Sequence, residues 1–390
     1  MSIEYNVQQK EIITSSVPWF RRGIKQVLEI SGPAGSGKTT IARAIMEILG
    51  LKMDEVLFMA YVGKAAMALA RNGLNAKTIH SSIYELVMVP KLDEYGNAIK
   101  VSGRTAMIPK FVKKEELDSR IKLLFIDEGS MVNEQMALDI LSFGLPVIVM
   151  GDLNQLPPVF GNPYFLRNPD YILTMIMRQA EGNPIIHLSQ KSIKGEYIKP
   201  GKYGDKCFVI EKEYITDNLM KSADAIICGR NKTRENINNY FRQNIIKTRK
   251  DFPSIGEKVI CRKNNWDECI EDNLYLINGM IGYIKDINLE TFNGKKLEID
   301  FQPDFVDNDY FRRLIIDFPY LFETVGEKKE RGRTFDNLFE FAYAITCHLS
   351  QGSQFSNVLY YDEIMGNKEF YNKLRYTAIT RAREGLVMAI

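Results

Sequence analysis

The stretch Gly32-Pro33-Ala34-Gly35-Ser36-Gly37-Lys38-Thr39 constrains this chain more than any other feature of its sequence. It matches G-x-x-x-x-G-K-[ST], the loop that wraps nucleotide phosphates, and its glycines let backbone N–H groups turn toward phosphate oxygens. In such a loop the Lys38 ammonium faces the β- and γ-phosphates, and the Thr39 hydroxyl is a ligand for Mg²⁺. We predict a strand over Val27–Ile30 before the loop and a helix over Thr40–Leu49 after it. The phosphates would therefore lie at a helix N-terminus, whereas the alternative is a glycine-rich turn without a ligand.

A second apolar strand, predicted over Ile121–Ile126, ends in Asp127 and Glu128. Asp127 would hold Mg²⁺, directly or through water, and Glu128 would orient and deprotonate the attacking water. A third apolar strand over Val147–Met150 leads to Gln155, whose amide can donate to a γ-phosphate and change partners after hydrolysis. Because ligands of α/β sheets gather at the carboxyl ends of strands, we expect these strand ends to face one crevice.

Composition narrows the class of protein. The 390 residues allow two or three domains, and 45% hydrophobic and 26% charged residues are typical of a soluble globular chain. The net charge of +2 leaves nucleic-acid binding to local basic stripes. The five cysteines form no CxxC pair and the three histidines are scattered, which argues against zinc or disulfide frameworks and fits a reducing cytoplasm. We find no secretory signal pattern and no apolar run of membrane-spanning length.

Several polar residues have two interpretations. Gln9, in the first predicted helix, has an amide that can read the adenine edge, or it is an exposed helical glutamine. Lys64 at a strand end, and Thr78 with His80 at a helix start, are typical of phosphate contacts. The alternatives are a solvated lysine and a helix cap. Arginines far in sequence from the P-loop are candidate arginine fingers or ordinary surface residues.

Residues 85–117 interrupt the α/β pattern. Here Val87–Pro90 and Ala98–Val101 are predicted as two short strands joined by a turn at Tyr95–Asn97. The segment is a small β excursion in this interpretation, and a surface loop in the alternative one.

A second α/β region begins near residue 171 and has no P-loop, so we expect one nucleotide site per chain. It is predicted to contain a strand over Ala225–Cys228 and a polar helix over Thr233–Arg242. An all-β insert interrupts this region, and the charge run Glu327–Arg331 is predicted as a solvated loop. The predicted strands of the insert are Gly256–Arg262, Ile277–Ile284 and Leu297–Phe301.

Taken in order, these stretches resemble the superfamily 1 helicases, specifically the RecD/Dda branch, over nearly the whole chain. Motifs I to VI correspond in order to GPAGSGKTT, FIDEGS, GDLNQLPP, MRQ with Pro184-Ile185, TCHLSQGSQF and YTAITRAR. The stretch around Gln9 resembles the adenine-reading motif, and Gly63–Ala66 and Thr78–His80 resemble motifs Ia and Ib. Motifs III, V and VI together are far more specific than the P-loop alone.

The resemblance implies an α/β fold of two RecA-like P-loop domains with ATP in the cleft between them. It further implies a small β-hairpin insert, 1B, and an SH3-like all-β insert, 2B. The expected ranges are 1–84 and 118–170 for domain 1A, 85–117 for the 1B pin, 171–254 and 336–390 for domain 2A, and 255–335 for 2B.

The resemblance also implies ATP and Mg²⁺ as cofactors and assigns roles to individual residues. The implied catalytic residues are Lys38, Glu128, Gln155, Arg178 and Arg381, both arginines approaching the γ-phosphate from domain 2A. The implied nucleotide-binding residues are Gln9, Gly32, Pro33, Ala34, Gly35, Ser36, Gly37, Lys38, Thr39, Thr40 and Gly352, and the implied metal ligands are Thr39 and Asp127. The implied DNA contacts are Lys64, Thr78, His80, Thr346 and His348.

Three positions depart from the family pattern. Tyr61-Val62 stands where Pro-Thr is common in motif Ia, and Leu349 replaces a frequent lysine in motif V. Gly129 replaces a frequent alanine or serine in motif II. The first two departures remove possible contacts to the DNA strand, and none of the three alters the predicted hydrolysis residues.

The sequence thus predicts an ATP-dependent 5′-to-3′ DNA helicase that translocates on single strands and unwinds duplex. The alternative is a single-strand translocase or remodelling ATPase, or the motor subunit of a nuclease complex, without intrinsic unwinding. A non-motor P-loop kinase would leave motifs III, V and VI unexplained. The expected partners are single-stranded DNA, single-/double-strand junctions and single-strand-binding or replication and recombination proteins. We expect a monomer in the cytoplasm of a prokaryotic or phage-infected cell.

Overall fold

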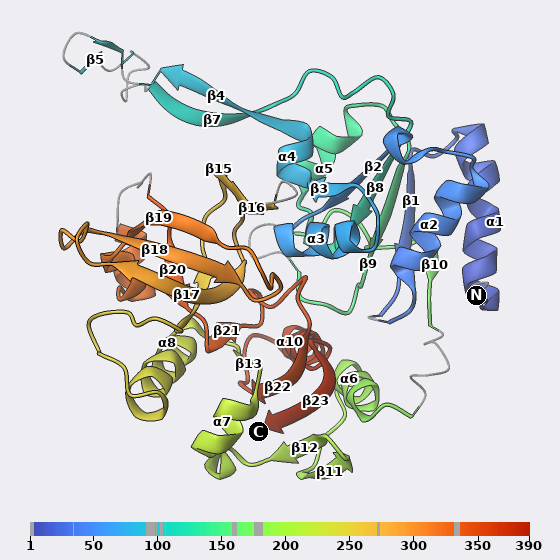
Figure 1. Ribbon diagram of the computed structural model, residues 1–390. Coiled ribbons are helices and arrows are strands. Elements are labelled where there is room, and N and C mark those ends of the chain that lie inside the picture. Colours follow the sequence, from blue (N-terminus) through green and yellow to red (C-terminus); the bar gives the residue numbers. More distant parts are fainter. Residues whose placement is uncertain are drawn as a thin grey trace. The chain divides into compact units, whose positions relative to one another are not determined.

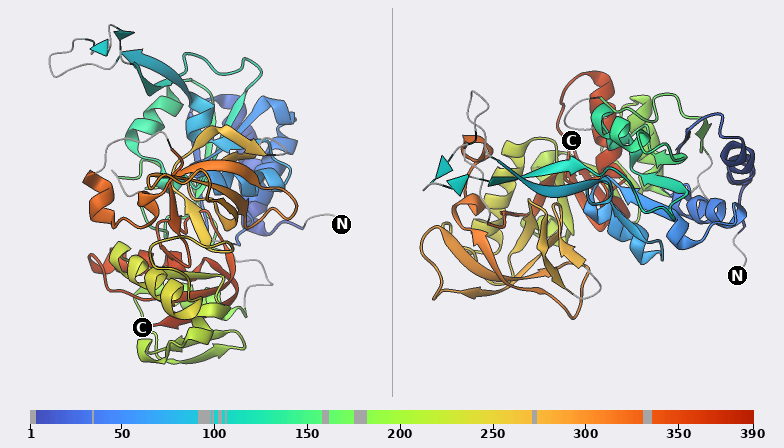
Figure 2. Two further views of the ribbon diagram at one scale, coloured as in Figure 1. Left: turned by 60° about the vertical axis from the view of Figure 1, so that its left-hand side comes forward. Right: turned by 90° about the horizontal axis from the view of Figure 1, so that it is seen from above.

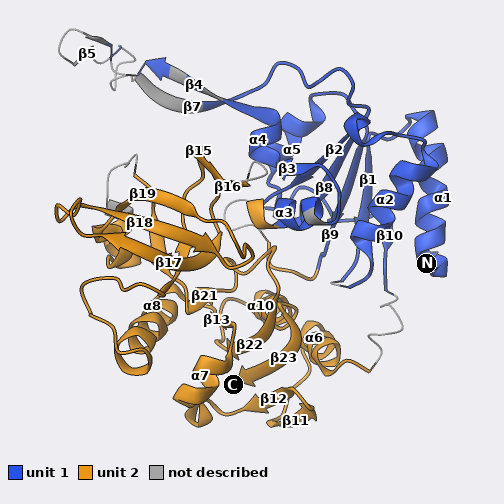
Figure 3. Cartoon of the chain, viewed as in Figure 1, with its two compact units in different colours: residues 1–61, 65–153, 160–175 blue, residues 62–64, 154–159, 176–390 orange. Residues whose placement is uncertain are grey.

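The computed structural model describes residues 4–33, 35–90, 98, 100–101, 104–105, 107–157, 162–174, 182–270, 274–330 and 336–390. The chain divides into two compact units, shown in different colours in Figure 3. Unit 1 comprises residues 1–61, 65–153 and 160–175, and unit 2 comprises residues 62–64, 154–159 and 176–390. Gln155 is therefore part of unit 2 although it follows a strand of unit 1 by only a few residues.

Unit 1 is built on a six-stranded parallel sheet in the order β10-β1-β9-β8-β2-β3 (Figure 1). The strands are β1 (Val27–Ser31), β2 (Val56–Ala60), β3 (Ala76–Thr78), β8 (Leu123–Asp127), β9 (Val147–Gly151) and β10 (Tyr171–Ile172). Every residue of β9 is buried, as expected for a parallel strand covered on both faces. Because β9 lies between β1 and β8, the ends of those two strands are roughly 10 Å apart.

Helices cover the sheet of unit 1, and α1 and α2 lie side by side (Figure 1). On the sheet face that carries Leu124 and Ile126, apolar side chains of α4 and α5 complete a buried core. Helix α2 begins at Lys38, two residues before the predicted start. The helices are α1 (Val7–Arg22), α2 (Lys38–Ile48), α3 (Gly63–Arg71), α4 (Ile79–Ile83), α5 (Glu134–Leu141), and the 3₁₀ turns η1 (Met53–Glu55) and η2 (Gly129–Met131).

The β excursion of unit 1 pairs differently from the sequence prediction. Strand β4 (Tyr84–Pro90) pairs antiparallel with β7 (Met107–Lys113) over its whole length, and the short strand β5 (Lys100–Val101) pairs with β6 (Arg104–Thr105). The predicted pairing of Val87–Pro90 with residues 98–101 is therefore wrong. A long in-register ladder satisfies more backbone groups than the short one would. The predicted turn residues 95–97 lie outside the described residues, and the β4–β7 ribbon projects beyond the parallel sheet of unit 1 (Figures 1 and 2).

Unit 2 contains a second six-stranded sheet, in the order β11-β12-β23-β22-β13-β21, which is parallel except for the β11–β12 pair. One face packs against α6 and α10, and the other packs against α7 and the helical segment that begins with α8. The strands are β11 (Gly201–Gly204), β12 (Cys207–Ile210), β13 (Ala225–Cys228), β21 (Ala344–Thr346), β22 (Phe355–Tyr361) and β23 (Ala382–Ala389). The helices are α6 (Pro184–Lys194), η4 (Lys212–Tyr214), α7 (Asp217–Ser222), α8 (Asn231–Tyr240), the π-helix η5 (Phe241–Ile245) and α10 (Lys368–Ile379).

The insert within unit 2 is a five-stranded antiparallel sheet in the order β19-β18-β17-β14-β20. A separate ribbon, β15–β16, accompanies it. The strands are β14 (Lys258–Cys261), β15 (Asn265–Ile270), β16 (Leu274–Leu276), β17 (Ile281–Asn288), β18 (Lys296–Pro303), β19 (Phe311–Asp317) and β20 (Phe339–Phe341). The helical turns are η7 (Pro319–Leu321) and α9 (Val325–Glu330).

Two predictions for the insert need correction. The strand predicted from Ile277 begins only at Ile281, because the chain turns at Gly279, where φ is 89°. The solvated loop predicted for the charge run is wrong for its described part, residues 327–330, which belongs to α9. There the Lys328 side chain is only 10% exposed and forms an ion pair of 2.7 Å with Glu340. The charge run predicts a solvated Lys328, but this lysine instead pairs with the buried carboxylate of Glu340.

A buried ion pair joins the parallel-sheet part of unit 2 to its antiparallel insert. Arg242, in η5, donates to Glu257 at 2.6 Å, and each side chain is 1% exposed. The Arg242 guanidinium also lies 3.8 Å from the ring centroid of Phe341.

Within the described part of the chain, no helix is long and apolar enough to cross a membrane. The finer division into two interrupted domains and two inserts stays a prediction.

Candidate active site

The phosphate-binding loop of unit 1 follows β1 and ends at α2. Gly35 and Gly37 have φ of 80° and 81°, a backbone region that side chains with a Cβ rarely adopt. A methyl group at Gly32 would lie 2.6 Å from Ser36 Oγ and 2.9 Å from Leu173 Cβ. The loop is therefore a tight cradle that requires glycine at these positions. Its residue Ala34 lies outside the described part of the chain.

Two polar side chains of the loop fit a polyphosphate. Lys38 Nζ donates to the carbonyl oxygens of Gly32 and Pro33 at 2.7 and 3.1 Å, which places the ammonium at the loop. The Ser36 side chain is fully buried, and its hydroxyl has no hydrogen-bond partner in the described part of the chain. Thr39 and Thr40 continue the first turn of α2. Backbone N–H groups, an ammonium and hydroxyls are the donors that phosphate oxygens accept.

Gln9 contacts this loop. Its Nε2 donates to the carbonyl of Ser36 at 3.0 Å, and its Oε1 accepts from the backbone N–H of Asn6. A methyl group at Gly37 would lie 2.6 Å from Gln9 Nε2, and Gln9 is 2% exposed. The exposed-glutamine interpretation is therefore wrong, while adenine recognition stays a prediction. Sequence reasoning missed the cap at Asn6, although Asn-x-x-Gln before an apolar run is a capping-box signal.

The acidic pair lies at the carboxyl end of β8. Asp127 Oδ1 accepts from the Glu128 N–H at 2.9 Å, and Glu128 has a φ of 54°. A non-glycine residue in this left-handed region costs about 1–3 kcal/mol, which is typical of functional turns. Desolvation by burial raises the pKa of Asp127 above its usual range, although the Lys38 ammonium and the Glu128 N–H oppose the shift.

The residues present fit Mg²⁺ bound together with a nucleotide. The described residues contain no cluster of three or more histidine, cysteine or acidic side chains that could hold a metal alone. Mg²⁺ is usually held by one or two protein oxygens together with phosphates and water. Thr39 and Asp127 would supply the protein oxygens, and the bound ion would neutralise charge that develops on the phosphates.

The structure explains the departure at Gly129. A methyl group there would lie 2.2 Å from Val149 Cγ1 and 3.3 Å from the carbonyl oxygen of Met150. The turn after Glu128 therefore packs directly on β9, and only glycine fits at this contact.

Other candidate site residues belong to unit 2. Gln155 is 4% exposed, and its Oε1 is buried without a hydrogen-bond partner in the described part of the chain. The next residue, Leu156, is held on both sides of its main chain by Thr377 and Gln351. The predictions assigned these two residues no role, although both lie within the stretches that carry motifs VI and V.

Arg381 ends the turn between α10 and β23. Its side chain is 3% exposed and donates to the carbonyl oxygens of Thr377 and Ser353 at 3.1 and 3.2 Å. Gly352, at the start of the chain toward β22, has a φ of 70°. The surface-arginine interpretation is thus wrong for Arg381. Arg178 lies outside the described residues, and its role stays a prediction.

The residues of unit 1 that are predicted to contact DNA, Thr78 and His80, lie at the start of α4. Thr78 caps this helix by accepting from the Ser81 N–H at 3.2 Å, so the helix-cap interpretation is confirmed. The His80 ring lies 5.5 Å from the Tyr84 ring and 6.2 Å from the Phe111 ring, and Phe111 is 50% exposed. Burial lowers the pKa of His80, which favours the neutral form of this imidazole.

The other residues that are predicted to contact DNA, Lys64, Thr346 and His348, belong to unit 2. The Lys64 side chain is 18% exposed and lies 4.0 Å from Asp304, so it is not a freely solvated lysine. Thr346 is 6% exposed, and its hydroxyl accepts from the Leu349 N–H at 3.4 Å. Burial lowers the pKa of His348 as it does that of His80.

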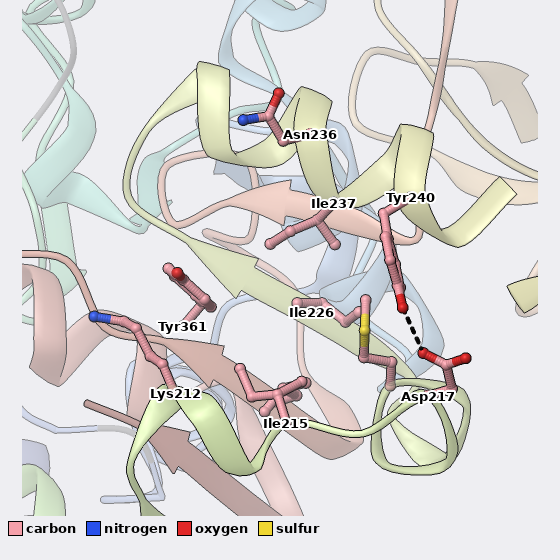
Figure 4. A pocket seen from close by; sticks show the side chains of 10 residues that line it. Lys212, Ile215, Asp217, Ile226, Asn236, Ile237, Tyr240 and Tyr361 are labelled. Carbon is pink, nitrogen blue, oxygen red and sulfur yellow. Dashed lines mark hydrogen bonds between the residues drawn. The ribbon is translucent and has the colours of Figure 1, made fainter. Parts of the chain in front are cut away.

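A separate pocket of about 390 Å³ lies on the α7–α8 face of unit 2 (Figure 4). Its base is apolar, with Ile226 and Ile237, and Tyr240 donates to Asp217 at its edge at 3.0 Å. Tyr361, at the carboxyl end of β22, contributes to its wall, whereas Arg381 lies at the amino end of the parallel strand β23. The pocket shares no lining residue with the predicted site, and we assign it no part in nucleotide binding.

Comparison with known proteins bears on this arrangement. The family model described as an AAA domain matches residues 21–161, and the model described as a UvrD-like helicase C-terminal domain matches residues 341–389. The chain is 25% identical over 92% of its length to the ATP-dependent RecD2 DNA helicase of Deinococcus radiodurans. It is 25% identical over 61% of its length to the ATP-dependent DNA helicase dda of Enterobacteria phage T4, and 27% identical over 93% to an uncharacterised protein of Methanocaldococcus jannaschii. It spans 46%, 57% and 36% of these relatives' lengths, respectively.

Solved structures of Pif1 helicases share the fold. One from a study of DNA unwinding at forked duplexes has a TM-score of 0.58 at 18% identity, with coverage of 100% of this chain and 92% of that one. Bacteroides Pif1 bound to single-stranded DNA has a TM-score of 0.55 at 17% identity, with coverage of 100% and 93%. The mixed α/β fold with parallel-sheet cores, as in two-domain superfamily 1 helicases, is confirmed, while the two inserts stay predictions. The predicted resemblance to the RecD/Dda branch is confirmed as well.

The predicted role of Glu128 as general base has a direct test. Replacing Glu128 with glutamine is expected to slow ATP hydrolysis by about 10²–10⁴-fold, because an amide could not take a proton from the attacking water. Nucleotide affinity should change little, since the amide keeps the size of the carboxylate. Single-turnover hydrolysis and equilibrium binding of a fluorescent ATP analogue would separate the two effects. Lost affinity with near-normal turnover would mean that Glu128 is structural.

Proposed function

We propose that this superfamily 1 helicase-like chain is an ATP-driven motor that translocates 5′ to 3′ on single-stranded DNA and unwinds duplex. The observation that carries the proposal is that the predicted hydrolysis residues belong to both units. The P-loop, Asp127 and Glu128 belong to unit 1, whereas Gln155 and Arg381 belong to unit 2. The names of the RecD2 and dda relatives, both ATP-dependent DNA helicases, support the same reaction.

The proposed hydrolysis step follows from the chemistry of each side chain. The P-loop N–H groups and Lys38 would hold the β- and γ-phosphates, and Thr39 and Asp127 would hold Mg²⁺. Glu128 takes a proton from the water that attacks the γ-phosphorus, and Gln155 orients that phosphate or water. Arg381 would neutralise charge that develops on the transferred phosphoryl group as the bond to the β-phosphate oxygen breaks and ADP leaves. Each cycle would advance the chain along the strand.

Grip on DNA would come from the phosphate backbone and therefore depend on salt. Thr78, His80, Thr346, His348 and Lys64 are the proposed contacts. In the chain without DNA, burial lowers the pKa of both histidines and so favours their neutral forms. The salt dependence is expected to come mainly from lysines and arginines.

The decisive experiment compares duplexes that carry either a 5′ or a 3′ single-stranded tail. With ATP and Mg²⁺, the 5′-tailed duplex should be unwound and the 3′-tailed one should not. Unwinding from the 3′ tail alone would contradict the proposed direction. ATPase activity that does not respond to single-stranded DNA would contradict the motor.

The second candidate function keeps the motor without unwinding. Two positive results would favour this second function: single-stranded DNA stimulates the ATPase, and the protein displaces a protein block from single strands. Both tailed duplexes should then stay intact. Because the chain spans about half the length of the curated relatives that it matches, the unwinding assay would then be repeated with added partner proteins.

A further inference from the structure

We propose that Thr377 and Gln351 are positioning residues that hold Gln155 through the main chain of Leu156 and so couple it to Arg381. This inference rests on the proposed function, because it assigns the route by which two of its hydrolysis residues act together. It concerns residues of unit 2 alone.

Leu156 is fully buried, and both of its main-chain polar groups are bonded by side chains. Its N–H donates to Thr377 Oγ1 at 2.9 Å, and its carbonyl oxygen accepts from Gln351 Nε2 at 3.0 Å. Thr377 is 0% exposed and Gln351 is 3% exposed. Because water cannot replace either partner at this depth, loss of one bond would leave a buried group unsatisfied.

The Leu156 N–H belongs to the peptide plane that begins with the carbonyl carbon of Gln155. Fixing this plane restricts the direction in which the Gln155 side chain leaves the backbone. On the other side, Pro157 limits the conformations of Leu156 itself. The main chain that carries Gln155 is therefore fixed, and the Oε1 of its amide is buried without a hydrogen-bond partner in the described part of the chain.

Thr377 has a second bond that leads to Arg381. While its hydroxyl accepts from Leu156, its carbonyl oxygen accepts from Arg381 Nε at 3.1 Å. Gln351 in turn lies in the turn that follows β21, three residues after His348 and five after Thr346, the last residue of that strand. A shift of Gln155 on hydrolysis would thus reach both the proposed arginine finger and the loop proposed to contact DNA. We call this set of bonds, made by Thr377 and Gln351 to Leu156, the Leu156 clamp.

The clamp is tested by Thr377→Val, which removes the hydroxyl and keeps the shape of the side chain. Turnover at saturating ATP and single-stranded DNA should fall about tenfold, with a smaller change in the KM for ATP. Thr377→Ser restores the hydroxyl and should recover most of the turnover. Gln351→Met removes the donor to the Leu156 carbonyl and should act in the same direction as Thr377→Val.

A double-mutant cycle separates positioning from general stability. In a Gln155→Ala background, Thr377→Val should cause little further loss of turnover, since its effect passes through Gln155. Ser192→Ala is the matched control, because Ser192 is also fully buried and donates to the Leu188 carbonyl at 2.9 Å. This control should leave turnover unchanged, and thermal unfolding of each variant reports the cost in stability.

The proposal is overturned if Thr377→Val keeps wild-type turnover, or if it lowers turnover equally with and without Gln155. It is also overturned if Thr377→Ser fails to restore turnover although it folds like the wild type. If single-stranded DNA did not change the ATP turnover of the wild-type protein, that result would instead refute the proposed motor. The same cycle on basal turnover would still decide whether the clamp positions Gln155.

Discussion

Replacing Arg381 with alanine is expected to lower ATP turnover by about 10³–10⁵-fold, the loss attributed to an arginine finger. ATP affinity should fall far less, because Arg381 belongs to unit 2 whereas the P-loop belongs to unit 1. Arg381→Lys should remain strongly impaired, since an ammonium cannot reproduce the planar fork of a guanidinium. Steady-state turnover on saturating single-stranded DNA, beside equilibrium ATP binding, measures the split.

Arg383→Ala is the control for this experiment. Arg383 lies two residues further on in β23, is exposed and donates only to Ser356 Oγ at 3.1 Å among the described residues. Its loss should leave turnover near wild type. Because Arg381 is buried and bonded to two carbonyl groups, circular dichroism must first show that the Arg381 variants fold. A folded Arg381→Ala protein with normal turnover would exclude Arg381 as the finger.

Replacing Lys38 with alanine is expected to reduce ATP turnover below detection. Loss of one preorganised donor at a transition state typically costs about 10²–10³-fold, and in the proposed mechanism Lys38 would also supply the charge that faces the β- and γ-phosphates. Binding of single-stranded DNA without nucleotide should persist, since Lys38 is not among the proposed DNA contacts. A turnover assay and fluorescence anisotropy with a labelled oligonucleotide would measure both properties.

Lys25→Ala provides the matched control for Lys38→Ala. Lys25 is also in unit 1, is 51% exposed and pairs with Asp170 at 2.6 Å. An exposed ion pair of this kind contributes at most about 1 kcal/mol to stability, so the Lys25 variant should hydrolyse ATP normally. Near-normal turnover in the Lys38 variant would refute the assignment of the P-loop as the hydrolysis site.

The features that follow from short stretches of chain were predictable from the sequence. The P-loop is contiguous with the strand before it and the helix after it, so the glycine spacing, Lys38 and the flanking periodicity all lie between Val27 and Ile48. The strand that ends at Asp127 could be predicted for the same reason, because a continuous apolar run and its polar end are local signals. The order of the motifs then indicated a resemblance to superfamily 1 helicases, and the comparisons bear out that resemblance.

Only the tertiary structure decided which distant residues meet. The local sequence pattern favoured an exposed helical position for Gln9. In the structure the Gln9 amide is buried and donates to the carbonyl oxygen of Ser36. Strand β4 took β7 as its partner, because pairing depends on the whole ladder and not on the nearest turn signal. Lys328 pairs with Glu340, which no local charge count could reveal. The Leu156 clamp likewise joins residues about 200 positions apart. Sequence periodicity reports the burial of a segment, whereas its partner is chosen by packing across the whole fold.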